Sequence, residues 1–343
     1  MRPPFHHPAI GTCGRGIRRA RGFSLIELMV ALVLGLVVIG AAVGVFLSNK
    51  QSYRTNYALG QVQEASRIAF ELLARDLRQA GLTGCGNTTR VANTLNNQAT
   101  TWWANFGNAI RGYDGNQDDP AVVEGTGTAQ RVVGTDSIQL IGAGESGLSV
   151  QSHNPTAANF KLNEPSADLQ DGDIIIVCDP DHAAITQVTN YNSSNVTLVH
   201  NTGTASPGNC SKGLGFPTQC TVNGNPYTFG ANSQIAKLSA ADWYIGNNPM
   251  GGRSLYRLAL GTNSGAAVTT AMEMVRDVTD LQLEYLTQGG IDYVPASAIT
   301  DWRQVIAVRI ILTAQGSEAF TGTDGQPIRR SFTTIVTLRN RVS

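Results

Sequence analysis

A long apolar run near the N-terminus dominates the hydrophobic pattern of the chain. Residues 23–47 read FSLIELMVALVLGLVVIGAAVGVFL, and Glu27 is the single charged residue among them. As a helix this run would be about 37 Å long, enough to cross a hydrocarbon layer of about 30 Å. A cleaved secretory signal and a buried core helix are the alternatives, but the run is longer than a signal-peptide core and no A-x-A-like site follows it. The pattern therefore predicts a membrane-inserted helix.

The pattern becomes amphipathic over residues 48–80. Apolar residues recur there at steps of three and four, at Leu59, Val62, Ala65, Ala69, Leu72, Leu73, Leu77 and Ala80. Charged residues suited to solvent occupy the other face, at Glu64, Arg67, Glu71, Arg75, Asp76 and Arg78. Residues 23–80 contain no proline, and Gly81 stands where the residue after a helix is expected. We predict one helix over 23–80, whose second half packs on a folded domain.

The remainder, residues 81–343, has the pattern of a β-rich head. Residues 81–130 are rich in Gly and Asn, and we expect them to be irregular. Strand-like alternation follows, separated by Gly, Asn, Asp and Pro clusters, at 137–141, 173–178, 196–200, 281–286, 305–312 and 332–338. The fold class is therefore α+β, with an antiparallel β-sheet head beside the second half of the helix.

Charge adds an orientation to this picture. The chain has 343 residues with 25 Lys plus Arg and 25 Asp plus Glu, so its net charge offers no case for nucleic-acid binding. Residues 1–22 contain five Arg and no acidic residue. The positive-inside rule therefore places the N-terminus in the cytoplasm and everything after the apolar run on the other side of the membrane.

The boundary between the basic segment and the apolar run carries a specific motif. Residues 21–28 read RGFSLIEL, which resembles the class III signal of type IV pilins and pseudopilins. The resemblance implies that residues 1–22 are a leader, that prepilin peptidase cuts between Gly22 and Phe23, and that Phe23 is N-methylated. It also implies that Glu27 neutralises the N-terminal amine of a neighbouring subunit during assembly. Such a partner would explain a carboxylate in an apolar helix, which is costly when unpaired.

Short stretches of the head are similar to PilW-type minor pilins. These are 80–86, 110–115, 172–179, 302–309 and 337–341. The resemblance implies a minor pilin without a cofactor that primes assembly of the type IV pilus and lies at or near its tip, in support of twitching motility and adhesion. The protein would first be a single-pass inner-membrane protein with a periplasmic head, in contact with lipid, and later part of a surface pilus. The implied partners are other minor pilins, the major pilin, prepilin peptidase, the inner-membrane assembly platform and a tip adhesin.

Two other functions share the same N-terminus. A minor pseudopilin of a type II secretion system has the same signal and differs by its head. A ligand-binding adhesin head on a pilin stalk is the other alternative, and a saturable surface site would distinguish it.

Four cysteines remain after the leader, at Cys85, Cys178, Cys210 and Cys220. An even number in an exported head is typical of disulfides, and four cysteines allow three connectivities. Cys210 and Cys220 flank a short Gly/Pro-containing loop, so we expect them to pair, which leaves Cys85 with Cys178. The absence of C-x-x-C argues against a zinc site.

The head shows no catalytic motif. Its three His are scattered, and H-E-x-x-H, G-x-S-x-G and a phosphate-binding Gly loop are missing, so we do not expect an enzyme. The Asp179-Pro-Asp181-His182 cluster is typical of a turn. Trp102, Trp103, Trp243 and Tyr244 suit either a contact surface or core packing.

One partial metal motif occurs after residue 113. Asp114, Asn116 and Asp118 match the start of a calcium loop, D-x-N-x-D. The match then fails, because Asp119 replaces the required glycine and Gly125 replaces the bidentate glutamate. These three residues are therefore weak calcium candidates.

Overall fold

The computed structural model describes residues 22–86, 90–96, 98–203, 206–317 and 325–338. The chain divides into two compact units, Met1–Tyr53 and Arg54–Ser343. The expected leader, except for Gly22, lies outside the described residues, as does the end of the 337–341 stretch.

The long helix of the sequence pattern is α1, Leu25–Gln79. It contains no proline and only four glycines, so its backbone hydrogen bonds run without interruption. It ends where Gly81 adopts a φ of 77°, the left-handed conformation that glycine tolerates best. The expected helix of 23–80 is thus present with slightly shorter bounds.

Eleven of the described strands form one large sheet. Its main order is β1-β6-β5-β9-β3-β4-β8-β7, with β10 beside β9, β11 beside β10 and β2 beside β3. The bounds are β1 Val91–Asn93, β2 Ile110–Tyr113, β3 Ser137–Asn154, β4 Asn159–Leu162, β5 Ile174–Cys178, β6 Ala183–Gln187, β7 Asn190–Asn192, β8 Thr197–Val199, β9 Gln234–Asn247, β10 Arg253–Asn263 and β11 Ala266–Arg276. Among these described strands, only β1 and β6 pair in parallel.

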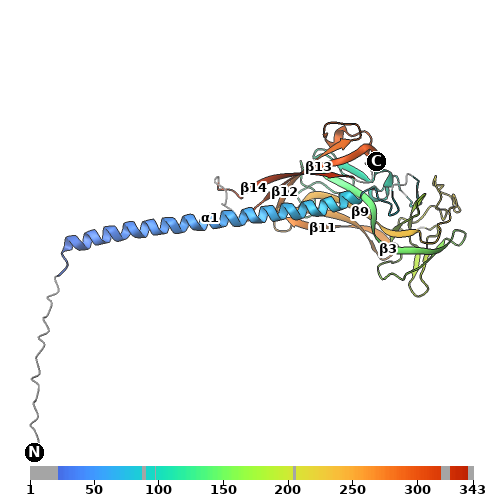
Figure 1. Ribbon diagram of the computed structural model, residues 1–343, viewed down its shortest axis with the longest axis horizontal. Coiled ribbons are helices and arrows are strands. Elements are labelled where there is room, and N and C mark those ends of the chain that lie inside the picture. Colours follow the sequence, from blue (N-terminus) through green and yellow to red (C-terminus); the bar gives the residue numbers. More distant parts are fainter. Residues whose placement is uncertain (1–21, 87–89, 97, 204–205, 318–324, 339–343) are drawn as a thin grey trace, which may run out of the picture. The chain divides into compact units, whose positions relative to one another are not determined.

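A second, antiparallel sheet consists of β12 Val278–Thr287, β13 Val305–Gln315 and β14 Arg329–Thr337. Short 3-10 helices lie in the connections, η1 Trp102–Ala104, η2 Phe106–Asn108, η3 Ala296–Ala298 and η4 Trp302–Gln304. Figure 1 shows β12, β13 and β14 beside the second half of α1.

The main core lies between this second half of α1 and both sheets. Val62, Ala69, Leu73 and Leu77 of the helix are fully buried in one cluster with residues of β3, β9, β12 and β13. Alternate residues of β13 supply the sheet side, namely Val308, Ile310, Leu312 and Ala314. The helical and strand periods of the sequence therefore meet at one interface, as expected for an α+β fold.

The end of α1 is seated directly on β3. Gly81 donates its backbone N–H to the carbonyl of Ile141 at 2.8 Å, and Ala143 donates to the carbonyl of Leu82 at 2.8 Å. A Cβ on Gly142 would lie 2.2 Å from the carbonyl oxygen of Gln79. Gly142 therefore permits an approach between helix and strand that a side chain would block.

Two expectations about the head need correction. Residues 81–130 are not wholly irregular, because they contain β1, β2, η1 and η2. These elements have only three or four residues each and include Asn and Gly, so they carry little periodicity. The expected set of strands also lacks β4, β6, β7, β9, β10 and β11. Nearly every residue of β9 from Ala240 to Gly246 is buried, so this strand shows no alternation of apolar and polar residues.

Candidate functional site

The start of α1 is held by a reciprocal capping box. Glu27 donates its backbone N–H to Ser24 Oγ at 3.2 Å, and Glu27 Oε2 accepts hydrogen bonds from the Ser24 backbone N–H at 3.0 Å and from Ser24 Oγ at 3.1 Å. This is the S-x-x-E arrangement that satisfies free N–H groups at a helix start. Gly22 and Phe23 precede the helix and are exposed. The Glu27 carboxylate thus has a partner within its own chain, which the sequence interpretation did not consider.

The first part of α1 presents an uncovered apolar surface. From Leu25 to Leu47 its large apolar side chains are about half to three-quarters exposed. Among the described residues, α1 is the one helix long and apolar enough to cross a membrane. A surface of this size in water is unfavourable, so it requires lipid or other apolar helices around it.

The second half of α1 is tied to the large sheet by Asp76. The Oδ2 atom of Asp76 accepts the indole N–H of Trp243 at 2.9 Å and the Nε–H of Arg257 at 2.7 Å. The side chain of Asp76 is only 12% exposed. The expectation that Asp76 faces solvent is therefore wrong, because a buried carboxylate is tolerated where an ion pair and a neutral donor satisfy it.

Two disulfides join distant parts of the head. Cys85 pairs with Cys178, 93 residues away, and Cys210 pairs with Cys220, 10 residues away. Both pairings agree with the sequence expectation. The longer bridge joins the segment that follows α1 to the last residue of β5, and so attaches the C-terminal end of the helix to the sheet.

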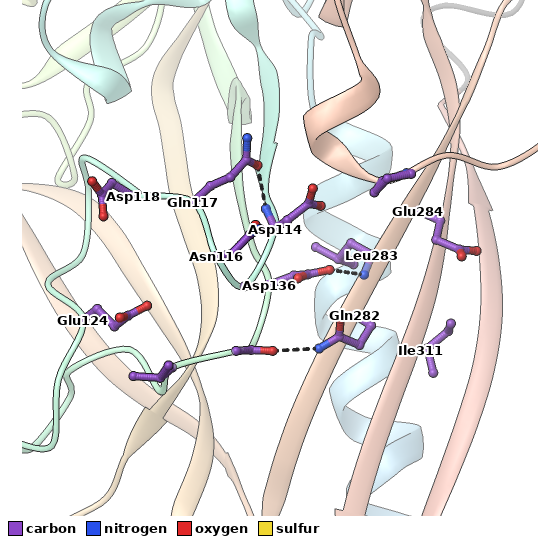
Figure 2. A pocket seen from close by; sticks show the side chains of 14 residues that line it. Asp114, Asn116, Gln117, Asp118, Glu124, Asp136, Gln282, Leu283, Glu284 and Ile311 are labelled. Atoms are coloured by element: carbon purple, nitrogen blue, oxygen red, sulfur yellow. Dashed lines mark hydrogen bonds between the residues drawn. The ribbon is translucent and has the colours of Figure 1, made fainter.

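The calcium candidates lie at an acidic pocket of about 630 Å³. Both carboxylate oxygens of Asp114 accept backbone N–H groups, from Ala296 at 2.8 Å and Ser297 at 2.9 Å. Figure 2 shows the carboxylates of Asp114 and Asp118 pointing in different directions. The described residues contain no group of three His, Cys, Asp or Glu side chains placed to hold a metal ion. Asp114 instead fixes the start of η3.

Asp136 lines the same pocket from the start of β3. Its Oδ2 accepts the backbone N–H of Leu283 at 2.7 Å, as Figure 2 shows. Burial raises the pKa of Asp136 to about 6, and the hydrogen bond from Leu283 opposes that rise. The pocket is therefore acidic, but two of its carboxyl groups, those of Asp114 and Asp136, already accept hydrogen bonds from backbone N–H groups.

Two family models match this chain, one near each of its ends. A model of the prokaryotic N-terminal methylation motif matches residues 17–43, and a model of type IV pilus-assembly protein W matches residues 242–340. The first covers the capping box and the apolar helix start, and the second runs from the middle of β9 through β14. The chain is a PilW-like type IV pilin. No curated protein and no solved structure gives a match.

The two matches support a minor pilin of the type IV pilus, and this context suggests pilins and the pilus machinery as its partners. The methylation motif and the apolar helix fit a single-pass inner-membrane protein that is later assembled into a surface pilus. Both matched families are structural pilus components rather than enzymes.

The aromatic candidates of this PilW-like head pack in or against its core. Trp243 and Tyr244 are 1% exposed, Trp103 is 8% exposed, and Trp102 is partly buried against two of the core clusters. Asp179 Oδ1 accepts the backbone N–H groups of Asp181 and His182 in the turn between β5 and β6. The expected turn is therefore present.

The sequence interpretation missed a pair of histidines. The Nε2 atoms of His153 and His200 are 3.1 Å apart, and His153 Nδ1 accepts the backbone N–H of Phe229 at 3.2 Å. Burial lowers the pKa of His153 to about 4 and that of His200 to about 3. Both rings are therefore neutral at physiological pH. Their positions, 47 residues apart, give no sequence signal.

Proposed function

We propose that this minor pilin acts with other minor pilins to prime assembly of the type IV pilus and lies at or near the pilus tip, where it supports twitching motility and adhesion. The observation that carries the proposal is the combination of an uncovered apolar helix behind a methylation motif with a PilW-type head. A tip subunit has fewer neighbours than a subunit in the shaft. A bulky head with long insertions, such as residues 81–343, is compatible with that position.

Processing would occur at the Gly22–Phe23 bond, followed by N-methylation of Phe23. Two features support this site. Residues 22–24 are exposed and precede the first helical residue, Leu25, so a peptidase can reach non-helical backbone there. Cleavage at this bond leaves the apolar helix intact.

The new amine of Phe23 would then bring a positive charge to an apolar environment. Glu27 is the one acid within the apolar run, and its carboxylate accepts hydrogen bonds from the backbone and the hydroxyl of Ser24. A carboxylate among lipid tails or packed apolar helices gains most from a cation. We assign Glu27 the role of receiving the amine of a neighbouring subunit during assembly, with the Ser24 cap as its partner before assembly.

The partners follow from this position. The apolar half of α1 would contact lipid first and then the helices of the major pilin and of other minor pilins. Prepilin peptidase and the inner-membrane assembly platform would act on it before assembly, and a tip adhesin would contact the head.

Deletion of the gene tests the proposal if surface pili, twitching and type II secretion are scored separately. We expect loss of pili and twitching with normal secretion, and recovery of both on complementation with the intact gene. Normal pili with lost secretion would instead identify a secretion pseudopilin. Normal pili with lost adhesion alone would identify an adhesin carried on a pilin stalk. Either result would overturn the priming role.

A further inference from the structure

A carboxyl group with no conventional partner lies in the middle of the large sheet. Asp242 of β9 stands opposite Gln139 of β3 and Leu258 of β10, and its side chain is fully buried. Within the described part of the chain, neither of its oxygens accepts a hydrogen bond from an N–H or O–H group. An ionised carboxylate in such a place would be very costly. Two side chains lie within reach of it, the carboxyl of Asp119 and the amide of Gln139, and that amide donates its Nε2–H to Asp119 instead.

Asp119 has the opposite character, because its oxygens are surrounded by donors. Its Oδ1 accepts the backbone N–H of Ala121 at 2.9 Å and the Nε2–H of Gln139 at 2.7 Å. Its Oδ2 accepts the hydroxyl of Ser137. With three donors directed at its two oxygens, Asp119 acts as an acceptor in this cluster.

The nearest cation does not neutralise Asp242 directly. Arg131 is 1% exposed, and its guanidinium donates to the backbone carbonyls of Thr135, Gln117 and Asp114 at 2.6 to 2.9 Å. Its charge favours one negative charge in the cluster. Two ionised carboxylates in contact would carry two negative charges. The single guanidinium of Arg131, which already donates to carbonyl groups, cannot neutralise both.

We propose that Asp242 is protonated and donates its proton to Asp119, and that this shared proton fastens residues 114–135 to strands β3 and β9. The segment belongs to the connection between β2 and β3. It is also held by Arg131 and by the hydroxyl of Tyr244, which donates to the carbonyl of Ala129 at 2.8 Å. The same segment forms one wall of the acidic pocket in Figure 2. The proton site therefore controls how firmly that wall is attached.

One neighbouring group, Asp136, has a pKa that burial raises to about 6, so it changes charge in the same pH range. Asp136 is present in both the wild type and Asp242→Asn, so a comparison of the two isolates the contribution of Asp242. Arg131 stays cationic. Burial raises the pKa of Tyr113 to about 12, and it raises the pKa values of Tyr244 and Tyr285 above their usual range. Burial, followed by the charge of Asp119, raises the pKa of Asp242 well above its usual range. Folding should therefore take up a proton at Asp242, and stability from this group should fall as the pH rises from about 4 through its folded pKa.

Two isosteric variants of the full chain in detergent micelles test this assignment. Asp242→Asn keeps a donor for Asp119 and cannot titrate. Asp119→Asn is the matched control, because it also removes a carboxyl group from the cluster but replaces one of the two oxygens that accept from Gln139, Ser137 and Ala121 by an NH2 donor. Denaturant unfolding between pH 5 and 8 can be followed by the fluorescence of Trp243, which is 1% exposed and adjacent to Asp242.

We expect Asp242→Asn to fold and Asp119→Asn to be destabilised at every pH. The unfolding equilibrium constant of the wild type should rise relative to that of Asp242→Asn, by up to about tenfold per pH unit. An infrared band of a protonated carboxyl group at the acidic end of this pH range should be stronger in the wild type than in Asp242→Asn.

Three results would overturn the proposal. The first is a parallel pH dependence of wild type and Asp242→Asn. The second is an Asp242→Asn variant that fails to fold or is as unstable as Asp119→Asn, which would mean that Asp242 acts as an anion. The third is stabilisation of the wild type, but not of Asp242→Asn, by calcium relative to a chelator, which would place a metal ion between the carboxylates.

Discussion

The carboxylate of Asp76 on α1 accepts the indole N–H of Trp243 on β9 at 2.9 Å, across 167 residues of sequence. The same oxygen accepts Arg257 of β10 at 2.7 Å. One helix residue therefore contacts two adjacent strands of the large sheet. This contact fixes the rotation of the second half of α1 on the head, because apolar packing alone is less directional than hydrogen bonds.

Asp76→Ala should lower the free energy of unfolding by about 2 to 4 kcal/mol, because it leaves the guanidinium of Arg257 and the indole N–H of Trp243 without their acceptor. Glu71→Ala on the exposed face of the same helix is the control. Glu71 and its partner Arg67 have 66% and 80% exposed side chains, so the change should stay within about 0.5 kcal/mol. Denaturant unfolding measures both. Equal effects of the two substitutions would contradict the anchoring role of Asp76.

The two disulfides should differ in their contribution to stability. Loop-closure entropy gives about 4.7 kcal/mol for a bridge closing about 100 residues and about 3 kcal/mol for one closing 10 to 15 residues. Replacing Cys85 and Cys178 together by Ser should therefore cost more than replacing Cys210 and Cys220 together. Unfolding of the two double variants under oxidising conditions makes the comparison. A larger loss of unfolding free energy in the Cys210/Cys220 variant would contradict the prediction that the longer bridge contributes more.

The His153–His200 pair should make the head sensitive to acid. Both pKa values are lowered in the folded state, so the unfolded chain binds more protons below its usual value of about 6.5. The stability from this pair is complete above about pH 6.5 and is lost as the pH falls towards 4. His200→Gln removes one titrating group while its amide can still accept the N–H of His153. The fall in stability between pH 7 and pH 5 should be shallower in this variant, and an unchanged slope would contradict the prediction.

Glu27 can be tested separately in its two roles. Glu27→Gln keeps the hydrogen-bonding ability of the helix cap but removes the charge, whereas Ser24→Ala removes the cap and keeps the charge. We expect Glu27→Gln to insert into the membrane and to assemble poorly, and Ser24→Ala to assemble near the wild-type level. Protein in the membrane and in sheared pili gives the readout. Wild-type assembly of Glu27→Gln would exclude the proposed ion pair with a neighbouring amine.

Elements with a clear period could be predicted from the sequence. The apolar run at 23–47 and the steps of three and four over 59–80 predict α1 within two residues at its start and one at its end. Strand β13 could be predicted because it alternates, with Ile310 and Leu312 facing the core. Both disulfide partners could also be inferred, because the short spacing of Cys210 and Cys220 leaves one pair.

Elements without a hydrophobic period could not be predicted from the sequence. Strand β9 is buried on both faces and contains Ser239, Ala240, Ala241 and Asp242, residues that are not enriched in strands. The contacts of Asp76, the Asp119–Asp242 pair and the His153–His200 pair all depend on strand register, which the sequence alone does not determine. The Ser24–Glu27 capping box is different, because its S-x-x-E spacing is present in the sequence and predicts the cap directly.

The N-terminal residue of the protein recovered from sheared surface pili is the most direct test of its assignment as a processed PilW-like pilin. Mass spectrometry of the N-terminal peptide should show a chain that begins at N-methylated Phe23, with Gly22 and all preceding residues removed. A chain that retains residues before Phe23, or that begins at another residue of α1, would contradict the account.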